Sequence, residues 1–197
     1  MSNKVDKLII GLGNPGTKYA NSRHNIGYDI AINIIKKYNG CYQSKLNIVN
    51  YSIINIKEKN VLIALPQTYM NHSGIAAQYL LDKYNIESAN MLVILDEYNF
   101  PLNKIHIKKV KSDGGHNGLS SILEITDAND FYILRCGIDK DFGSGEMANY
   151  VLSKFKKEDQ YGVDLMINNV ILAIEFYIEN EIGKSLSYIN SGKYLLL

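Results

Sequence analysis

Compact groups of polar residues follow the apolar segments of this 197-residue chain, and two of them contain groups suited to acid–base chemistry. Arg23-His24-Asn25 precedes a helical pattern, and Asp96 follows the apolar run Met91 to Leu95. A histidine with an acid behind it is a general base near neutral pH, because the acid fixes the tautomer and stabilises the imidazolium. A lone histidine is more often solvated or structural, so His24 is a catalytic candidate only together with its companions.

Asparagine and histidine side chains occupy further loops of the same kind. Asn14 lies in a glycine-rich loop, Asn71 in a loop after Leu65, and His116-Asn117 in a loop after Lys111. Ligands bind outside the carboxyl ends of strands in open α/β sheets, so we expect these loops to converge on one cleft. Asparagine holds a carbonyl, a water or a developing oxyanion without adding charge. These residue types favour hydrolysis by an activated water over an acyl-enzyme.

Three other chemistries fit the sequence less well. The loop from Gly11 to Gly16 matches G-x-G-x-x-G, but Pro15 removes a backbone donor and the helical pattern begins only near Asn25, which argues against a dinucleotide site. Ser73 is interpreted as a helix cap rather than a nucleophile. The four histidines are dispersed and the two cysteines share no ligand spacing, so we expect no metal and no other cofactor.

The pattern of apolar residues predicts the elements that position these loops. Strands are expected at 8–10, 51–57, 61–65, 91–95, 104–110 and 131–138, with a hairpin turn at Glu58-Lys59-Asn60. Helices are expected at 25–38, after a cap at Ser73 as far as Tyr84, around Leu119 to Ile125, and at about 161–180. This alternation predicts a single three-layer α/β domain over residues 1–197, with a mixed, mostly parallel central sheet and helices on both faces.

Composition and charge narrow the class of protein. Apolar residues make up 46% of the chain, enough for a sizeable core, and 21 Lys plus Arg against 20 Asp plus Glu give a net charge of +1. Any surface for nucleic acid must therefore be local. Met1 to Lys7 is polar with no signal-peptide run behind it, and no apolar stretch approaches the ~18–20 residues of a membrane span. We expect a cytoplasmic protein without a membrane partner.

Five blocks of the sequence resemble, in order and spacing, those of the bacterial-type peptidyl-tRNA hydrolases. They are GLGNPGTKYANSRHNIG, PQTYMNHSG, LDEYNFP, GGHNGL and LRCGI, and NYVLSKF resembles the closing segment of that family. The similarity runs from Leu8 to about Phe155. It implies cleavage of the ester between a peptide and the 3′-terminal ribose of tRNA in peptidyl-tRNA. It further implies a metal-free, usually monomeric enzyme with a C-terminal helical segment over the cleft.

The same resemblance implies a role for each candidate residue. His24 would activate water and Asp96 would orient it, while Asn14 belongs with them as a catalytic residue. Substrate would be bound by asparagines that position the peptide, the water and the carbonyl, and by their neighbours at the site: Asn25, Tyr69, Asn71, His116 and Asn117. Met70 would lie with Tyr69 in the floor of the cleft. Lys108 and Arg135 would clamp the 5′-phosphate of tRNA.

Several residues around the predicted phosphate clamp depart from the family pattern. Ser120 and Ile133 stand where Lys or Arg is common, Asn99 replaces an aspartate, Asp113 precedes the Gly-Gly turn, and segment 139–148 is shorter than usual. These departures predict fewer basic residues on the surface that would bind tRNA. The predicted catalytic residues are unchanged. The best local cations are His106, Lys108, Lys109 and Lys111 on one expected strand with Arg135 on another, although a solvated edge strand would look the same.

Two other functions stay open at the level of sequence. A binding protein on this scaffold could hold RNA without turnover, but loss of His24 or Asp96, its expected signature, is not observed. A small-molecule esterase or amidase would suit the nearly neutral surface. Hydrolysis of an N-blocked aminoacyl-tRNA that falls steeply with salt would distinguish the tRNA enzyme from both.

Overall fold

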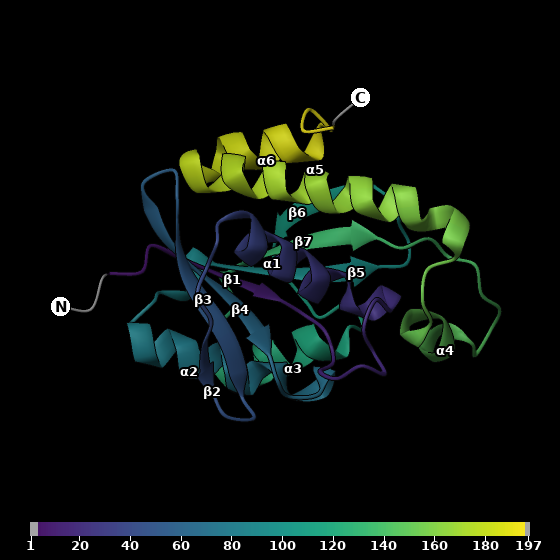
Figure 1. The fold of residues 1–197 in the computed structure, drawn as a ribbon, viewed down its shortest axis with the longest axis horizontal. Helices are drawn as coiled ribbons and strands as arrows, with labels where there is room; N and C mark the ends of the chain where they lie inside the picture. Colours follow the sequence, from purple (N-terminus) through teal and green to yellow (C-terminus); the bar gives the residue numbers. More distant parts are fainter. Residues whose placement is uncertain (1–3, 196–197) are drawn as a thin grey trace.

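Seven strands form one mixed sheet through the middle of the protein, in a computed structural model that describes residues 4–195 (Figure 1). The strand order is β2-β3-β4-β1-β5-β7-β6. The four central strands run parallel: β1 (Lys7–Gly11), β4 (Lys59–Pro66), β5 (Met91–Glu97) and β7 (Tyr132–Gly137). The flanking strands pair antiparallel: β2 (Gln43–Lys45), β3 (Val49–Ile56) and β6 (Ile105–Lys109). Residues 1–3 of the polar N-terminal segment lie outside the described residues.

Helices cover both faces of this sheet, which confirms the predicted three-layer α/β class. One face packs against α1 (Ile26–Lys37), α5 (Gln160–Glu179) and α6 (Ile182–Asn190), and the other against α2 (Ser73–Tyr84) and α3 (Asn117–Thr126) (Figure 1). Because both faces are covered, Leu8, Ile9 and Ile10 of β1 are all buried, which is why that strand reads as a continuous apolar run. A short helix, α4 (Met147–Leu152), stands apart from these layers.

The predicted hairpin is present as β3 and β4, with its turn shifted by one residue. Ile56 pairs with Lys59, so the two turn residues are Lys57 and Glu58, both with positive φ angles of 50° and 63°. A two-residue turn of this kind matches the twist of the flanking strands. Neither residue type prefers that conformation, which is why the sequence pattern placed the turn too late.

Ser73 is not the cap of α2, contrary to our expectation. It is the first residue of the helix, and its buried hydroxyl donates a hydrogen bond to the carbonyl oxygen of Met70 at 2.8 Å. Met70 begins the 3₁₀ turn η2 (Met70–His72), so Ser73 joins this turn to the helix. The turn carries Asn71 at the sheet edge where the site forms.

The last long helix departs from a second expectation. Residues Lys157–Glu179, which comprise η4 (Lys157–Asp159) and α5, are long and apolar enough by composition to cross a membrane. The expectation considered unbroken apolar runs, and polar residues such as Asp164 and Asn169 interrupt this segment, whereas its mean hydropathy over 18 residues is high. In the structure the helix packs against the sheet, and half of its most apolar 18-residue stretch is buried. A core helix has this property as well.

The start of α1 lies unusually close to the ends of β1 and β5. A Cβ atom at Gly27 would stand 2.3 Å from the carbonyl oxygen of Ile94, and the Tyr28 amide donates to the Leu12 carbonyl at 2.9 Å. The turn η1 (Arg23–Asn25), which precedes α1, is thereby fixed over the end of β5. Gly27 is required by this close approach.

Gly27→Ala is expected to lower the free energy of unfolding by about 1–3 kcal/mol, because the added methyl group meets backbone that cannot move aside. Thermal or urea unfolding measures the change. Gly183→Ala in α6 is the control: no atom lies within 4 Å of its added Cβ, so a helical alanine should stabilise by about 0.5–1 kcal/mol. Equal stability of Gly27→Ala and the wild type would contradict the close approach.

Candidate active site

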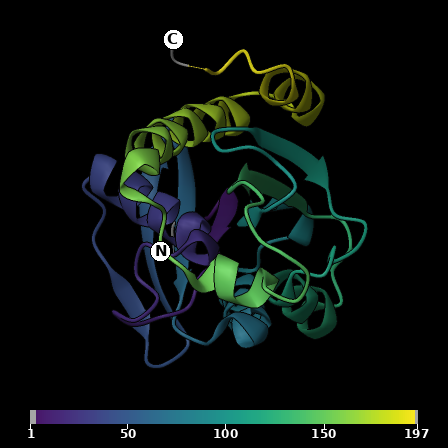
Figure 2. The same ribbon diagram turned by 90° about the vertical axis from the view of Figure 1, so that its right-hand side faces the viewer.

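A cavity of about 440 Å³ opens at the carboxyl edge of the parallel strands. Figure 2 looks toward this edge from the right-hand side of Figure 1. The loops after β1 and β4 meet there with the end of β5, as expected from the polarity of a parallel sheet. Every predicted site residue except Asn25 lines the cavity: Asn14, His24, Tyr69, Asn71, Asp96, Lys108, His116, Asn117 and Arg135.

His116 and Asn117 reach this cavity by a route that we did not predict. Strand β6 runs antiparallel to β7, with Lys109 opposite Tyr132, so its carboxyl end lies at the opposite edge of the sheet. Convergence of strand ends therefore does not bring His116 to the site. The segment from Val110 to Gly115 returns the chain along the cavity, where residues 112–115 form part of the wall.

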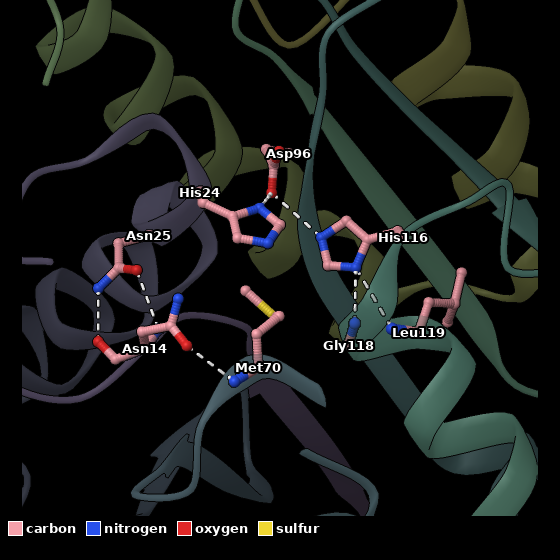
Figure 3. A network of polar contacts seen from close by, with 8 residues as sticks. All are labelled: Asn14, His24, Asn25, Met70, Asp96, His116, Gly118 and Leu119. Atoms are coloured by element: carbon pink, nitrogen blue, oxygen red, sulfur yellow. Dashed lines mark hydrogen bonds and ion pairs between the residues drawn. The ribbon is translucent and has the colours of Figure 1, made fainter. Parts of the chain in front are cut away.

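Two histidines share one carboxylate at the centre of the site (Figure 3). His24 Nδ1 lies 2.7 Å from Asp96 Oδ1, and His116 Nε2 lies 3.1 Å from the same oxygen. The ring centroids of the two histidines are 4.8 Å apart. The Asp96 side chain is buried at the end of β5, so its negative charge is matched by hydrogen bonds rather than by water.

The hydrogen bonds determine which nitrogen of each ring carries a proton. An ionised carboxylate only accepts, so His24 Nδ1–H and His116 Nε2–H both donate to Asp96. His116 Nδ1 accepts from the backbone amides of Gly118 and Leu119 and thus caps α3. His116 is held as a neutral cap. His24 keeps an unprotonated Nε2, which Figure 3 shows on the side of the ring facing Asn14 and Met70.

The environment tunes both members of the His24–Asp96 pair. Burial alone would lower the pKa of His24, but the charge of Asp96 and its hydrogen bond raise that pKa above the ordinary value. Burial alone would raise the pKa of Asp96, but His24 and His116 hold it well below its usual range. Asp96 therefore stays ionised, and His24 becomes a stronger base than a free imidazole.

Asn14 is fixed at three points, which leaves one group for a ligand. Its side-chain oxygen accepts from the Met70 amide at 2.8 Å, and its backbone is bound at both ends by the Asn25 side chain, each at 2.9 Å. The Asn14 amide nitrogen is then free to face the cavity, and Figure 3 shows it pointing toward the His24 ring. Such a donor suits a carbonyl or oxyanion.

Asn25 does not occupy the substrate-facing position that we expected. It is buried behind Asn14 and is absent from the cavity wall, because both ends of its amide bind Asn14 backbone. Tyr69, Asn71 and Asn117 do reach the cavity with exposed side chains. Met70 is buried beneath them in the cavity floor.

A cationic end of the cavity lies over β6 and β7. Lys108 and Arg135 both line it, and Arg135 Nη1 pairs with Glu97 Oε2 at 3.0 Å while its Nη2 lies 3.2 Å from His106 Nδ1. Partial burial and then the charge of Arg135 lower the pKa of Lys108. Ile133, opposite Lys108 in the sheet, leaves the floor between these cations apolar. Lys109 and Lys111, two of the expected cations, are exposed but lie outside the cavity wall.

The cavity also includes residues that sequence reasoning did not assign. Tyr19 lines it and packs edge-on against Tyr69 with ring centroids 6.3 Å apart. Met147, Val151 and Leu152 of α4 form another wall. The signals were present, since Tyr19 lies in the first sequence block and Val151 and Leu152 in the closing block. Only the fold shows that the two blocks meet.

Three of the central groups are close enough to hold a metal ion. Ligand atoms of His24, Asp96 and His116 all lie within 4.8 Å of one another. The two histidine nitrogens that face Asp96 already donate protons to it, so an ion between them would replace both hydrogen bonds. The donor set is better satisfied by the hydrogen bonds than by a cation.

Comparison with known proteins agrees with this geometry. The sequence profile of a family described as "Peptidyl-tRNA hydrolase" matches residues 8–195. A peptidyl-tRNA hydrolase of Persephonella marina is 34% identical over 184 residues, covering 93% of this chain and 97% of that protein. The crystal structure of an Arg119Gln mutant of the Acinetobacter baumannii peptidyl-tRNA hydrolase superposes with a TM-score of 0.88 at 29% identity, covering 97% and 98% of the two chains. A second structure of that enzyme gives 0.88 at 28% identity, over 96% and 98%.

Proposed function

We propose a hydrolytic function from one premise: the chain belongs to the peptidyl-tRNA hydrolase family. The chain cleaves the ester that joins a peptide to the 3′-terminal ribose of tRNA, and so releases both. The single observation that carries this proposal is the cavity in which a His24 base, a buried carboxylate and the Asn14 amide converge. An RNA-binding protein without turnover would have no use for a base tuned in this way.

The proposed reaction begins with a water between His24 Nε2 and the scissile carbonyl. His24 removes a proton from that water, and Asp96 stabilises the imidazolium that forms. The new C–O bond places negative charge on the carbonyl oxygen, which the Asn14 amide is oriented to bind. The intermediate collapses by breaking the ester bond, and the proton held by His24 passes to the leaving ribose oxygen.

The cationic end of the cavity determines on which side of the catalytic groups the tRNA lies. Lys108 and Arg135 lie on the β6–β7 side, where they suit the 5′-phosphate of tRNA. Glu97 compensates the charge of Arg135, whereas Lys108 forms no ion pair among residues 4–195. Lys108 is therefore the stronger phosphate ligand of the two.

Peptide release from purified peptidyl-tRNA tests the proposed function. The rate at sub-saturating substrate should fall steeply with increasing salt, because phosphate binding releases counterions. A small ester that carries the same acyl group but no tRNA should be cleaved far more slowly. Equal rates on both substrates would instead identify a small-molecule esterase, and tRNA binding without release would identify a binding protein.

Lys108→Ala is expected to raise KM for peptidyl-tRNA about tenfold and to leave kcat nearly unchanged, the effect of losing one charge-assisted contact worth about 1.4 kcal/mol. Lys109→Ala is the matched control, since Lys109 is the next residue of the same strand and lies outside the cavity. A substrate without the 5′-phosphate should be hydrolysed equally by both variants. Equal losses on both substrates would show that Lys108 does not bind that phosphate.

The proposed reaction uses no metal ion. Full activity is expected after treatment with a chelator and removal of the chelated metal, since His24 and His116 are engaged with Asp96 through protons. Activity assays before and after treatment, with metal content measured in parallel, check this. Activity that is lost and then restored by one divalent cation would place an ion among His24, Asp96 and His116.

The proposal also includes a monomeric, cytoplasmic enzyme. Support for a monomer comes from the cavity, whose wall and catalytic groups are supplied by a single chain. The exposed Cys41 thiol suits a reducing compartment. Light scattering of the active protein measures the oligomeric state.

A further inference from the structure

Arg23, the residue before His24, is buried, and no carboxylate among residues 4–195 contacts it directly. It is 4% exposed, and it forms no ion pair among the described residues 4–195. Burying a guanidinium away from water without a directly bound carboxylate is costly, so other contacts must compensate beside the longer-range attraction of the exposed Asp141. Arg23 lies in the first of the five sequence blocks but does not line the cavity, which indicates a role other than substrate contact.

The compensating contacts all come from the segment that carries α4. The guanidinium lies 4.3 Å from the Tyr150 ring centroid and 5.0 Å from that of Phe155. Arg23 Nη1 donates to Ser153 Oγ at 2.8 Å and to the Lys154 carbonyl at 2.6 Å. The guanidinium therefore has these two aromatic contacts and two hydrogen bonds only when this segment is packed against it.

The other contacts of the α4 segment are partial: Tyr150, Val151 and Phe155 pack half-buried against the core, and Lys154 forms an isolated backbone bridge with Ser22. None of the residues of α4 is fully buried, and Figure 1 shows the helix beyond the end of the main layers, with both views placing it beside the start of α1. A helix of this length is marginal without tertiary contacts. Tyr150 adds a hydrogen bond to the Ile138 carbonyl and a ring contact with Phe142, whose centroid is 4.9 Å away.

The opposite side of α4 faces the catalytic cavity. Met147, Val151 and Leu152 line it, across from His24 and Asn14. Arg23 also donates its backbone amide to the Ser153 carbonyl at 3.0 Å, which ties the same segment to η1. The α4 wall is thus tied to the turn that carries the base by the side chain and backbone of Arg23, beside the backbone bridge between Ser22 and Lys154.

We propose that Arg23 is a positioning residue that fixes the α4 wall of the cleft relative to His24. Through this wall it governs how tightly substrate is held against the base, and it does not touch the substrate itself. The inference rests on the proposed function for its kinetic consequence. Its structural consequence, the anchoring of residues 147–155, is independent of any substrate.

Arg23→Met, which keeps the aliphatic stem and loses the guanidinium, is the principal test. Amide hydrogens of 147–153 should exchange about tenfold faster or more, as expected when contacts of this strength are lost, while those of β1 and β5 should be unchanged. KM for peptidyl-tRNA should rise about tenfold with kcat reduced by less than about threefold. Arg23→Lys, which retains the charge, should recover part of both effects.

The controls separate anchoring from general destabilisation. Lys154→Met alters only an exposed side chain of the same segment and should leave exchange and KM at wild-type values. Ser153→Ala removes one acceptor of Arg23, together with the hydrogen bond that Ser153 Oγ donates to the Tyr150 carbonyl. It should give a smaller shift in the same direction, which covers the case in which Arg23→Met fails to fold.

Three outcomes would overturn the inference. Unchanged exchange at 147–153 in Arg23→Met and Ser153→Ala would show that Arg23 does not anchor α4. A loss confined to kcat would show that Arg23 acts on His24 and not through the wall. Faster exchange with an unchanged KM would show that the wall does not hold substrate. Absence of hydrolysis by the wild type would contradict the proposed function instead, since the exchange measurement does not depend on turnover.

Discussion

His24→Ala is expected to lower kcat for peptidyl-tRNA hydrolysis by a factor on the order of 10²–10⁴, the usual contribution of a positioned general base. No other unprotonated histidine nitrogen among the described cavity residues is free to replace it, because His116 Nδ1 is occupied by two backbone amides. KM should change little, since His24 acts on the water. Steady-state rates of peptide release over a range of substrate concentrations give kcat and KM separately.

His72→Ala is the matched control for this prediction. His72 is exposed in η2, close in sequence to Asn71, yet it lies outside the cavity wall. His72→Ala should unfold at nearly the wild-type temperature, because its side chain is exposed. His24→Ala should fold but be less stable, because the buried Asp96 carboxylate keeps only its hydrogen bond from His116. A His24→Ala protein with more than about a third of wild-type activity would mean that the base lies elsewhere.

Asp96→Asn is expected to cost roughly 10²–10⁴ in kcat and to change the pH dependence as well. An amide in this position can turn its NH₂ group toward His24 Nδ1, which then accepts and leaves the wrong nitrogen protonated. The same substitution removes the charge that stabilises the imidazolium. The loss should therefore appear in kcat, with the fold retained because the two side chains have nearly equal volume.

The sign of the pH effect follows from the environment of His24. The base is active when neutral, so the wild-type rate should fall as the pH drops below the raised pKa of His24. In Asp96→Asn the charge that raises this pKa is gone while burial, which lowers it, remains. The acid limb of the residual activity should move to lower pH. A pH–rate profile of kcat measures this shift directly.

Asp113→Asn is the control variant, because it removes one negative charge from the cavity without changing a contact of His24. Asp113 is a second carboxylate in the cavity wall, and its Oδ1 accepts from the Gly115 amide at 3.0 Å, a bond that asparagine can keep. Its acid limb should coincide with that of the wild type. An identical shift in both variants would mean that the net charge of the cavity, and not the Asp96 contact, sets the pKa of His24.

The placement of the candidate site was largely predictable from residue types and strand polarity. The runs at β1 and β5 are apolar throughout because both faces are covered, so their carboxyl ends and the polar groups that follow could be placed from the sequence. The polarity of parallel strands then puts Asn14 and Asp96 at one edge of the sheet. The helical period of α1 likewise predicted that His24 lies just before a helix, where the structure has the turn η1.

Other features depended on contacts between segments distant in the chain. His116 reaches Asp96 only because the segment after the antiparallel strand β6 turns back, and strand direction is a property of pairing that no local pattern encodes. Asn25 was assigned to substrate on the basis of its neighbour, but packing turned its amide toward Asn14 and away from the cavity. A side chain's direction at a helix start is decided by what lies behind it.

Residue type, periodicity and ordered motifs were sufficient to predict the layered fold, the family and the proximity of His24 and Asp96. Packing was needed for the tautomers of His24 and His116, the free donor of Asn14 and the anchoring of α4 by Arg23. Each of these is a hydrogen bond or ring contact between residues distant in the chain or at a newly formed helix end. Such contacts form only when the chain has folded. They determine which nitrogen atoms carry protons and where each polar group of the site points.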